Sequence, residues 1–203
     1  MRSETIERFL EDLATGAATP SGGPGAALSA ARGAALVAMV ARRSDRAGDT
    51  DVVARARDTC DGLRELALEL AEADERASDD VARARALPMT TEAEQDARSE
   101  AVAGALTGAG HVATAVIDVA DRTLAEAEAL RTVGDSAVLG GLAAAAEALR
   151  AAAGTARVEV ELTLAGITEP AVREELLDAL DPVDDLVLRA AKVTAAVREQ
   201  IVR

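Results

Sequence analysis

Apolar positions recur every three to four residues along most of the chain, which is the periodicity of amphipathic helices. Glycine and proline separate the segments that carry this pattern. It predicts helices over residues 3–13, 26–43, 51–86, 91–131, 134–150 and 170–203, the last with a break or kink at Pro182. Residues 158–164 alternate strictly, as a strand does, but no second segment offers them a partner, so we expect a helix there too.

Residues 26–43 differ from the other segments because they are apolar on all sides, with Arg32 as the one charge in their middle. A helix that is apolar all round is buried, and its small residues allow neighbouring backbones to approach closely. We therefore expect one all-α domain over residues 1–203, a helical bundle around this alanine-rich central helix.

Charge and composition exclude several classes of partner. The chain has 36 acidic and 22 basic residues, and a net charge of −14 repels nucleic acids and anionic membrane surfaces. Phe9 is the one aromatic residue, which excludes a site built on aromatic stacking. With a single cysteine, Cys60, and a single histidine, His111, the chain has no internal disulfide and no structural zinc site without carboxylates.

The amino-terminal residues are charged and amphipathic, unlike a signal peptide. No window reaches the ~18 strongly apolar residues of a membrane span. We expect a soluble cytoplasmic protein.

A loop of small residues, Pro20-Ser21-Gly22-Gly23-Pro24-Gly25, precedes the central helix. Backbone amides at a helix start attract an anion or a carbonyl oxygen, and glycines let a ligand come close. The alternative is a tight crossing between two helices, since the loop matches no nucleotide-binding spacing.

Two carboxylates are candidates for acid–base chemistry. Asp135 follows Gly134 before a helix, where it is either an N-cap or a base that orients water. Asp74 falls on the apolar seam of its helix, where it is either paired with an arginine or a site acid whose pKa burial tunes.

Three arginines, Arg42, Arg43 and Arg46, end the central helix. Cations suit the carboxyl end of a helix dipole, which is sufficient to explain them. In so acidic a chain they are also where an acidic ligand would bind.

Several segments in this order resemble the cyclodeaminase/cyclohydrolase family, which comprises the carboxyl-terminal domain of formiminotransferase-cyclodeaminase and free-standing methenyltetrahydrofolate cyclohydrolases. The resemblance covers nearly the whole chain and rests on the glycine loop, the alanine-rich helix, the run ending at Asp74, Ala86-Leu87-Pro88, Thr90 to Arg98, Gly134-Asp135 and residues 156–162. It implies an all-helical homodimer that acts on a folate without a cofactor.

The resemblance also implies roles for single residues. Asp135 would be the catalytic base, Pro20, Ser21, Gly22, Gly23 and Asp74 would line the folate site, and Arg42, Arg43 or Arg46 would replace the family's lysines at the glutamate tail. We expect the glycine turn and Asp135 to meet around one pocket.

The chain departs from the family pattern at several positions. The family's lysine-rich stretch after the central helix is absent, and Val112-Ala113-Thr114 stands where the family has Val-Pro-Leu. Pro24 stands where the family loop has serine, and Gly134 replaces the serine of a Ser-Asp pair. Two readings follow: a folate enzyme, either methenyltetrahydrofolate cyclohydrolase or formiminotetrahydrofolate cyclodeaminase, or a catalytically degenerate helical dimer that binds another small anion or a protein.

Overall fold

The computed structural model describes residues 5–15, 22–44, 50–133 and 138–202 of the chain. Within these ranges every regular element is a helix, which confirms the all-α prediction. The helices are α1 (Ile6–Ala14), α2 (Gly22–Ser44), α3 (Thr50–Arg85), α4 (Glu92–Val133), α5 (Gly140–Leu164), α6 (Pro170–Asp178) and α7 (Pro182–Val202).

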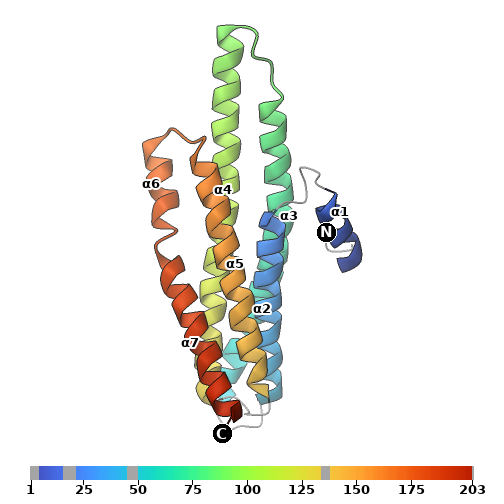
Figure 1. The fold of residues 1–203 in the computed structure, drawn as a ribbon, viewed down its shortest axis with the longest axis vertical. Helices are drawn as coiled ribbons and strands as arrows, with labels where there is room; N and C mark the ends of the chain where they lie inside the picture. Colours follow the sequence, from blue (N-terminus) through green and yellow to red (C-terminus); the bar gives the residue numbers. More distant parts are fainter. Residues whose placement is uncertain (1–4, 16–21, 45–49, 134–137, 203) are drawn as a thin grey trace.

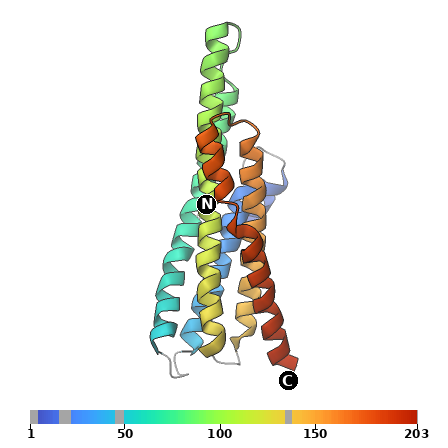
Figure 2. The same ribbon diagram turned by 90° about the vertical axis from the view of Figure 1, so that its left-hand side faces the viewer.

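Four of the helices form the bundle. α2 packs between α3 and α5, α4 completes the square opposite α2, and α7 lies against α5 and α4. The long helices α3 and α4 extend beyond the others as a hairpin (Figures 1 and 2). α1 lies at the side of the bundle, next to the start of α2, and it contacts the other helices only sparsely.

Local signals in the sequence set several helix ends. Glu94 N–H donates to the Thr91 hydroxyl at 3.2 Å and Thr91 N–H donates to the Glu94 carboxylate at 3.0 Å, so these two residues form a capping box at the start of α4. The break at Pro182 is also confirmed, because α6 and α7 are separate helices. For α1 the cap is Thr5, whose hydroxyl accepts from Arg8 N–H, and Ser3, where the sequence predicted the start of this helix, lies outside the described residues.

The alternating segment 158–164 belongs to α5, so the expectation of a helix there is confirmed. Where this helix begins was predicted wrongly. α5 starts at Gly140, with Leu139 at its N-cap and no side-chain cap, and Asp135 lies outside the described residues. The helix therefore starts six residues later than predicted.

The core is built from alanine, valine and leucine, and its small residues bring helices close together. Gly33 of α2 lies against Leu149 of α5, so closely that a Cβ atom at Gly33 would be 2.6 Å from Leu149 Cδ2. Alanines along both helices are fully buried beside it. Close approach of α2 and α5 replaces the large side chains that the composition lacks.

The prediction that α2 is buried on all sides is wrong for the single chain. Its inner face is buried, but Leu28, Ala35 and Leu36 are only half-buried and Met39 is exposed. α2 forms one corner of the square, and no described helix covers its outer side.

Two helical segments, Gly22–Ser44 and Glu92–Thr132, are long and apolar enough to cross a membrane by length and composition, contrary to the expectation from sequence. The apolar window of the first is mostly buried against other helices of the bundle. Core helices of soluble bundles have the same length and composition, so these two properties do not distinguish a membrane-spanning helix from a buried core helix.

Candidate functional site

The first turn of α2 packs directly against the carboxylate of Asp74 on α3. A Cβ atom at Gly23 would lie 2.5 Å from Asp74 Oδ2 and closer still to Oδ1, so a side chain at this position would displace the carboxylate. The helix begins at Gly22, four residues earlier than predicted, and Pro24 lies in its first turn, where proline needs no amide partner. The glycine segment therefore allows the start of α2 to pack against the Asp74 carboxylate.

Asp74 is buried, with 8% of its surface exposed, and it is the only carboxylate residue in the buried class among the described residues. The other buried residues of its helix are all apolar. Free backbone N–H groups and the helix dipole at the start of α2 favour the ionised form of a nearby carboxylate. Asp74 is therefore the candidate base of this region.

A second carboxylate, Glu159 of α5, lies over the same turn. Its Oε1 atom is 2.5 Å from where a Cβ atom of Gly22 would be, and Thr155 Cγ2 is 3.7 Å from that point. Glu159 is half-buried, and burial raises the pKa of its carboxyl group. Glu159 therefore keeps its proton to higher pH than an exposed glutamate.

Two carboxylates in different surroundings are what paired acid–base chemistry requires. Asp74 lies at the amino end of a helix, and Glu159 is desolvated. One side chain can accept a proton while the other donates one. We call Gly22, Gly23, Asp74 and Glu159 the carboxylate site.

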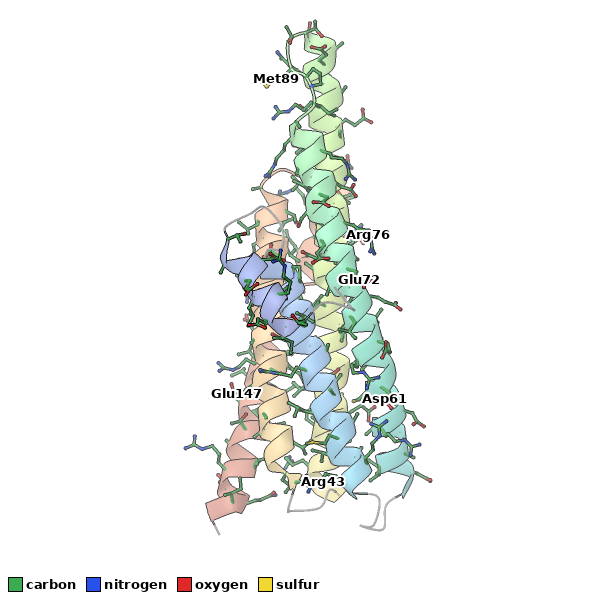
Figure 3. All side chains as sticks on the ribbon, turned by 90° about the vertical axis from the view of Figure 1, so that its right-hand side faces the viewer. Arg43, Asp61, Glu72, Arg76, Met89 and Glu147 are labelled. Carbon is green, nitrogen blue, oxygen red and sulfur yellow. The ribbon has the colours of Figure 1, made fainter. Side chains whose placement is uncertain are left out.

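The predicted basic cluster is not at the carboxylate site. Because a helix rises about 1.5 Å per residue, roughly 30 Å of α2 separate Gly23 from Arg43. In Figure 3, Arg43 lies at one end of the bundle and α1 near the middle. Arg42 is paired with Asp61 of α3, whereas Arg43 is exposed and makes no ion pair with a residue that the structure describes.

Four of the predicted site residues, Pro20, Ser21, Arg46 and Asp135, lie outside the described residues. The described residues that follow Asp135 belong to the same end of the bundle as Arg43. A Cβ atom at Gly141 would be 2.7 Å from Val40 Cγ2, near the end of α2. Of the predicted set, the structure brings together Gly22, Gly23 and Asp74.

An open groove of about 800 Å³ lies beyond the carboxylate site, between α4 and the turn that joins α5 to α6. Its polar lining includes Arg85, Arg98, Ser99 and Thr168. Arg98 Nε donates to the Arg85 carbonyl at 3.0 Å, which ties α4 to the end of α3. The groove shares no lining residue with the carboxylate site.

Other reactive groups do not add to the site. Within the described ranges no three His, Cys, Asp or Glu side chains gather as a metal site would require. Cys60 is buried in the core, and burial raises the pKa of its thiol to about 12, so it stays protonated and unreactive.

Sequence reasoning missed Glu159. The alternating pattern of its segment was used only to predict secondary structure. Once the segment is taken as helical, a glutamate between two valines is recognisable as a candidate site residue. On a helix, Glu159 follows Thr155 by one turn on the side toward α2, which periodicity could have indicated.

Comparisons with known proteins agree with the fold. The chain is 33% identical over 183 residues to a methenyltetrahydrofolate cyclohydrolase of Methylorubrum extorquens, with 88% of each chain covered. It is similar to the crystal structure of a formiminotetrahydrofolate cyclodeaminase from Thermotoga maritima, with a TM-score of 0.82, 22% identity, and 98% and 96% of the two chains covered.

Residues 5–182 match the formiminotransferase-cyclodeaminase family. This match spans both halves of the bundle, from α1 to the start of α7, and it includes the whole carboxylate site. The chain belongs to the formiminotransferase-cyclodeaminase family.

Proposed function

We propose that this protein hydrolyses methenyltetrahydrofolate to formyltetrahydrofolate. The observation that carries the proposal is the pair of carboxylates at the start of α2, with Asp74 beside the helix amino end and Glu159 desolvated. The similar protein of Methylorubrum extorquens is named for this activity, which supports the choice of substrate. No cofactor is needed, because water is the second reactant.

The chemistry requires one base and one acid. The methenyl carbon is cationic, so a positioned water adds to it readily. Asp74 accepts one proton from that water as the carbon–oxygen bond forms. Glu159 then gives its proton to the ring nitrogen as the carbon–nitrogen bond breaks, and it takes back the hydroxyl proton of the intermediate as the formyl carbonyl forms. Asp74 releases the proton that it took from water to solvent, which is the one net proton of the reaction.

The glycines at the start of α2 have a steric role in this scheme. Side chains at Gly22 or Gly23 would occupy the space in front of the carboxylates. A flat heterocycle can approach the backbone only where side chains are absent. Pro20 and Ser21 remain predicted contacts of the same ring.

Asp135 remains a predicted base, by resemblance to the family. Its substitution by alanine, measured beside substitution of Asp74, assigns the role to one of the two. If Asp135→Ala loses turnover and the Asp74 variant keeps it, Asp135 is the catalytic base and Asp74 is not.

The test is the loss of methenyltetrahydrofolate absorbance with purified protein, compared with buffer. We expect Glu159→Gln to lower kcat at least tenfold, because amides are not proton donors of useful acidity. The control is Glu161→Gln, which lies two positions further along α5 and removes only an exposed ion pair with Arg157. A wild-type rate equal to the buffer rate overturns the proposal.

A second candidate reaction is ammonia release from formiminotetrahydrofolate, a lyase activity. The fold likeness to the Thermotoga maritima cyclodeaminase favours testing it in parallel. The two reactions share the attack at a one-carbon amidine, so the same assay with formiminotetrahydrofolate separates them by product. If both substrates are inert, the degenerate helical dimer that binds another anion or a protein becomes the better account.

We further propose that the protein is a cytoplasmic homodimer. Its net charge of −14 disfavours nucleic acids and anionic membranes as partners.

A further inference from the structure

The groove between α4 and the turn that joins α5 to α6 takes no part in the proposed reaction. It has a volume of about 800 Å³ and is lined by none of the residues of the carboxylate site. In Figure 1, α6 and α1 lie on opposite sides of the bundle. A ligand in this groove would therefore leave the space at the start of α2 open to another molecule.

Hydrogen bonds hold both walls of the groove in place. On one side, Arg98 Nε of α4 donates to the Arg85 carbonyl at the end of α3, at 3.0 Å. On the other side, Arg173 Nη1 of α6 donates to the carbonyl of Ile167 at 3.0 Å and to that of Leu164, which fixes the turn after α5. Because these bonds form within one chain, the groove exists before a ligand arrives, and a ligand pays little to order it.

Two arginines of the groove have no carboxylate partner among the described residues. Arg98 is half-buried, and its hydrogen bonds go to the Arg85 carbonyl and to Met89 Sδ, neither of which neutralises its charge. Arg85 is exposed, and its guanidinium makes no ion pair with a residue that the structure describes. A guanidinium presents a planar set of N–H donors that matches a carboxylate or a phosphate. This end of the groove therefore suits an oxyanion.

Further along α4 the lining is mostly apolar. Val102 packs against a cluster that contains the buried side chain of Ile167, so the floor of the groove continues into the core. A Cβ atom at Gly104 would meet nothing within 4 Å, which leaves open space above the helix. Thr168, across the groove, has a hydroxyl that is bonded to no described residue and can donate or accept. This part suits an apolar body attached to the oxyanion.

Two glutamates of the lining limit the charge of the ligand. Glu100 and Glu169 are exposed and contribute one negative charge each. They repel a ligand with several anionic groups, such as a nucleoside triphosphate or a nucleic acid. The groove therefore favours a small molecule with one anionic group.

We propose that this groove is a second binding site, for a small organic molecule that carries one carboxylate or phosphate group on an apolar body. The oxyanion lies against Arg85 and Arg98, and the body lies along α4 over Gly104 toward Thr168. The inference goes beyond the proposed function and does not rest on it, because the groove and the carboxylate site share no residue.

The first test is binding of four probes to the purified protein, measured by isothermal titration calorimetry. Benzoate and phenyl phosphate carry one oxyanion each on a ring, inorganic phosphate lacks the ring, and benzyl alcohol lacks the charge. We expect one of the two ring anions to bind at least tenfold more tightly than inorganic phosphate and benzyl alcohol, and its head group distinguishes a carboxylate ligand from a phosphate ligand. No binding of either ring anion, or equal binding of inorganic phosphate, overturns the proposal.

The second test fills the groove without changing its charge. Gly104→Leu should abolish binding of the tighter ring anion, because the new side chain occupies the groove while its Cβ atom meets no neighbour. Gly108→Leu is the matched control, since it lies one turn along α4, has the same open space at Cβ and does not line the groove. Both variants should keep the helical circular dichroism. Full affinity in Gly104→Leu, or an equal loss in the two variants, overturns the proposal.

The third test separates contact from general attraction. Arg85→Gln should weaken binding about fivefold, because an exposed guanidinium is lost from the oxyanion. Arg83→Gln removes the same charge two positions away, from an arginine that is paired with Asp80, and should leave the affinity unchanged. Asp74→Asn should also bind the probe as the wild type does. Equal affinities in the two arginine variants, or lost binding in Asp74→Asn, overturns the proposal, and none of these measurements depends on turnover.

Discussion

Asp74 and Glu159 are the same kind of group in two different surroundings. Asp74 is buried against the backbone of Gly23 at a helix start, whereas Glu159 is half-buried and burial raises the pKa of its carboxyl group. The absence of a side chain at residue 23 is what allows this arrangement, and it is a property of one residue that can be tested alone.

Gly23→Ala should lower kcat/KM at least tenfold, because its Cβ atom would overlap the Asp74 carboxylate and displace it. Gly62→Ala on α3 is the matched control, since a Cβ atom there meets nothing within 4 Å. The control should keep full activity and gain about 0.5–1 kcal/mol of unfolding free energy, measured by urea denaturation. Full activity in Gly23→Ala would show that the carboxylate need not lie there.

The pH dependence of kcat should report Glu159. A donor acts in its protonated form, and a raised pKa keeps that form populated to higher pH, so kcat should fall as pH rises through this pKa. In Glu159→Gln the remaining rate should lose this descending limb. A limb that persists unchanged in the variant assigns the donor to another group.

Sequence reasoning found one of these two carboxylates. Asp74 was recognisable because a charge on an apolar helix seam is unusual, and the structure places it against the predicted glycines. Glu159 was missed because its segment alternates, and nothing local shows that α2 starts beside it. Contacts between α2, α3 and α5 depend on how the bundle closes, which spacing along one helix does not specify.

At the scale of elements, periodicity predicted the helices well and their ends less well. The capping box of Thr91 and Glu94 located the start of α4, because its hydrogen bonds are local. The start of α2 was placed four residues late, because glycine and proline disfavour a helix interior but are tolerated in the first turn. Helix ends without such local bonds depend on packing.

The close approach of α2 and α5 predicts a specific sensitivity. Gly33→Ala should lower the unfolding free energy by about 1–3 kcal/mol, because its Cβ atom would press into the buried side chain of Leu149. Gly108→Ala, exposed on α4 with open space at its Cβ position, should be neutral or stabilising. Equal stability of the two variants, measured by thermal unfolding, would contradict close packing of α2 and α5.

At the scale of the whole molecule, the bundle sets where each functional group lies. The resemblance to a family supplied the fold and an ordered set of candidate residues, and the helical class is confirmed. Residue order alone did not specify which residues of other helices lie beside each end of α2. Gly23 and Arg43 belong to successive segments of the family pattern. Because α2 is long, they lie at opposite ends of this helix.

The most direct measurement of the central claim is the rate of methenyltetrahydrofolate hydrolysis in Asp74→Asn, a change that keeps the shape of the side chain and removes its charge. We predict a loss of about 10²-fold or more in kcat/KM with the helical circular dichroism retained, and no loss in Asp79→Asn, an exposed carboxylate on the same helix. Wild-type turnover in Asp74→Asn would contradict the account.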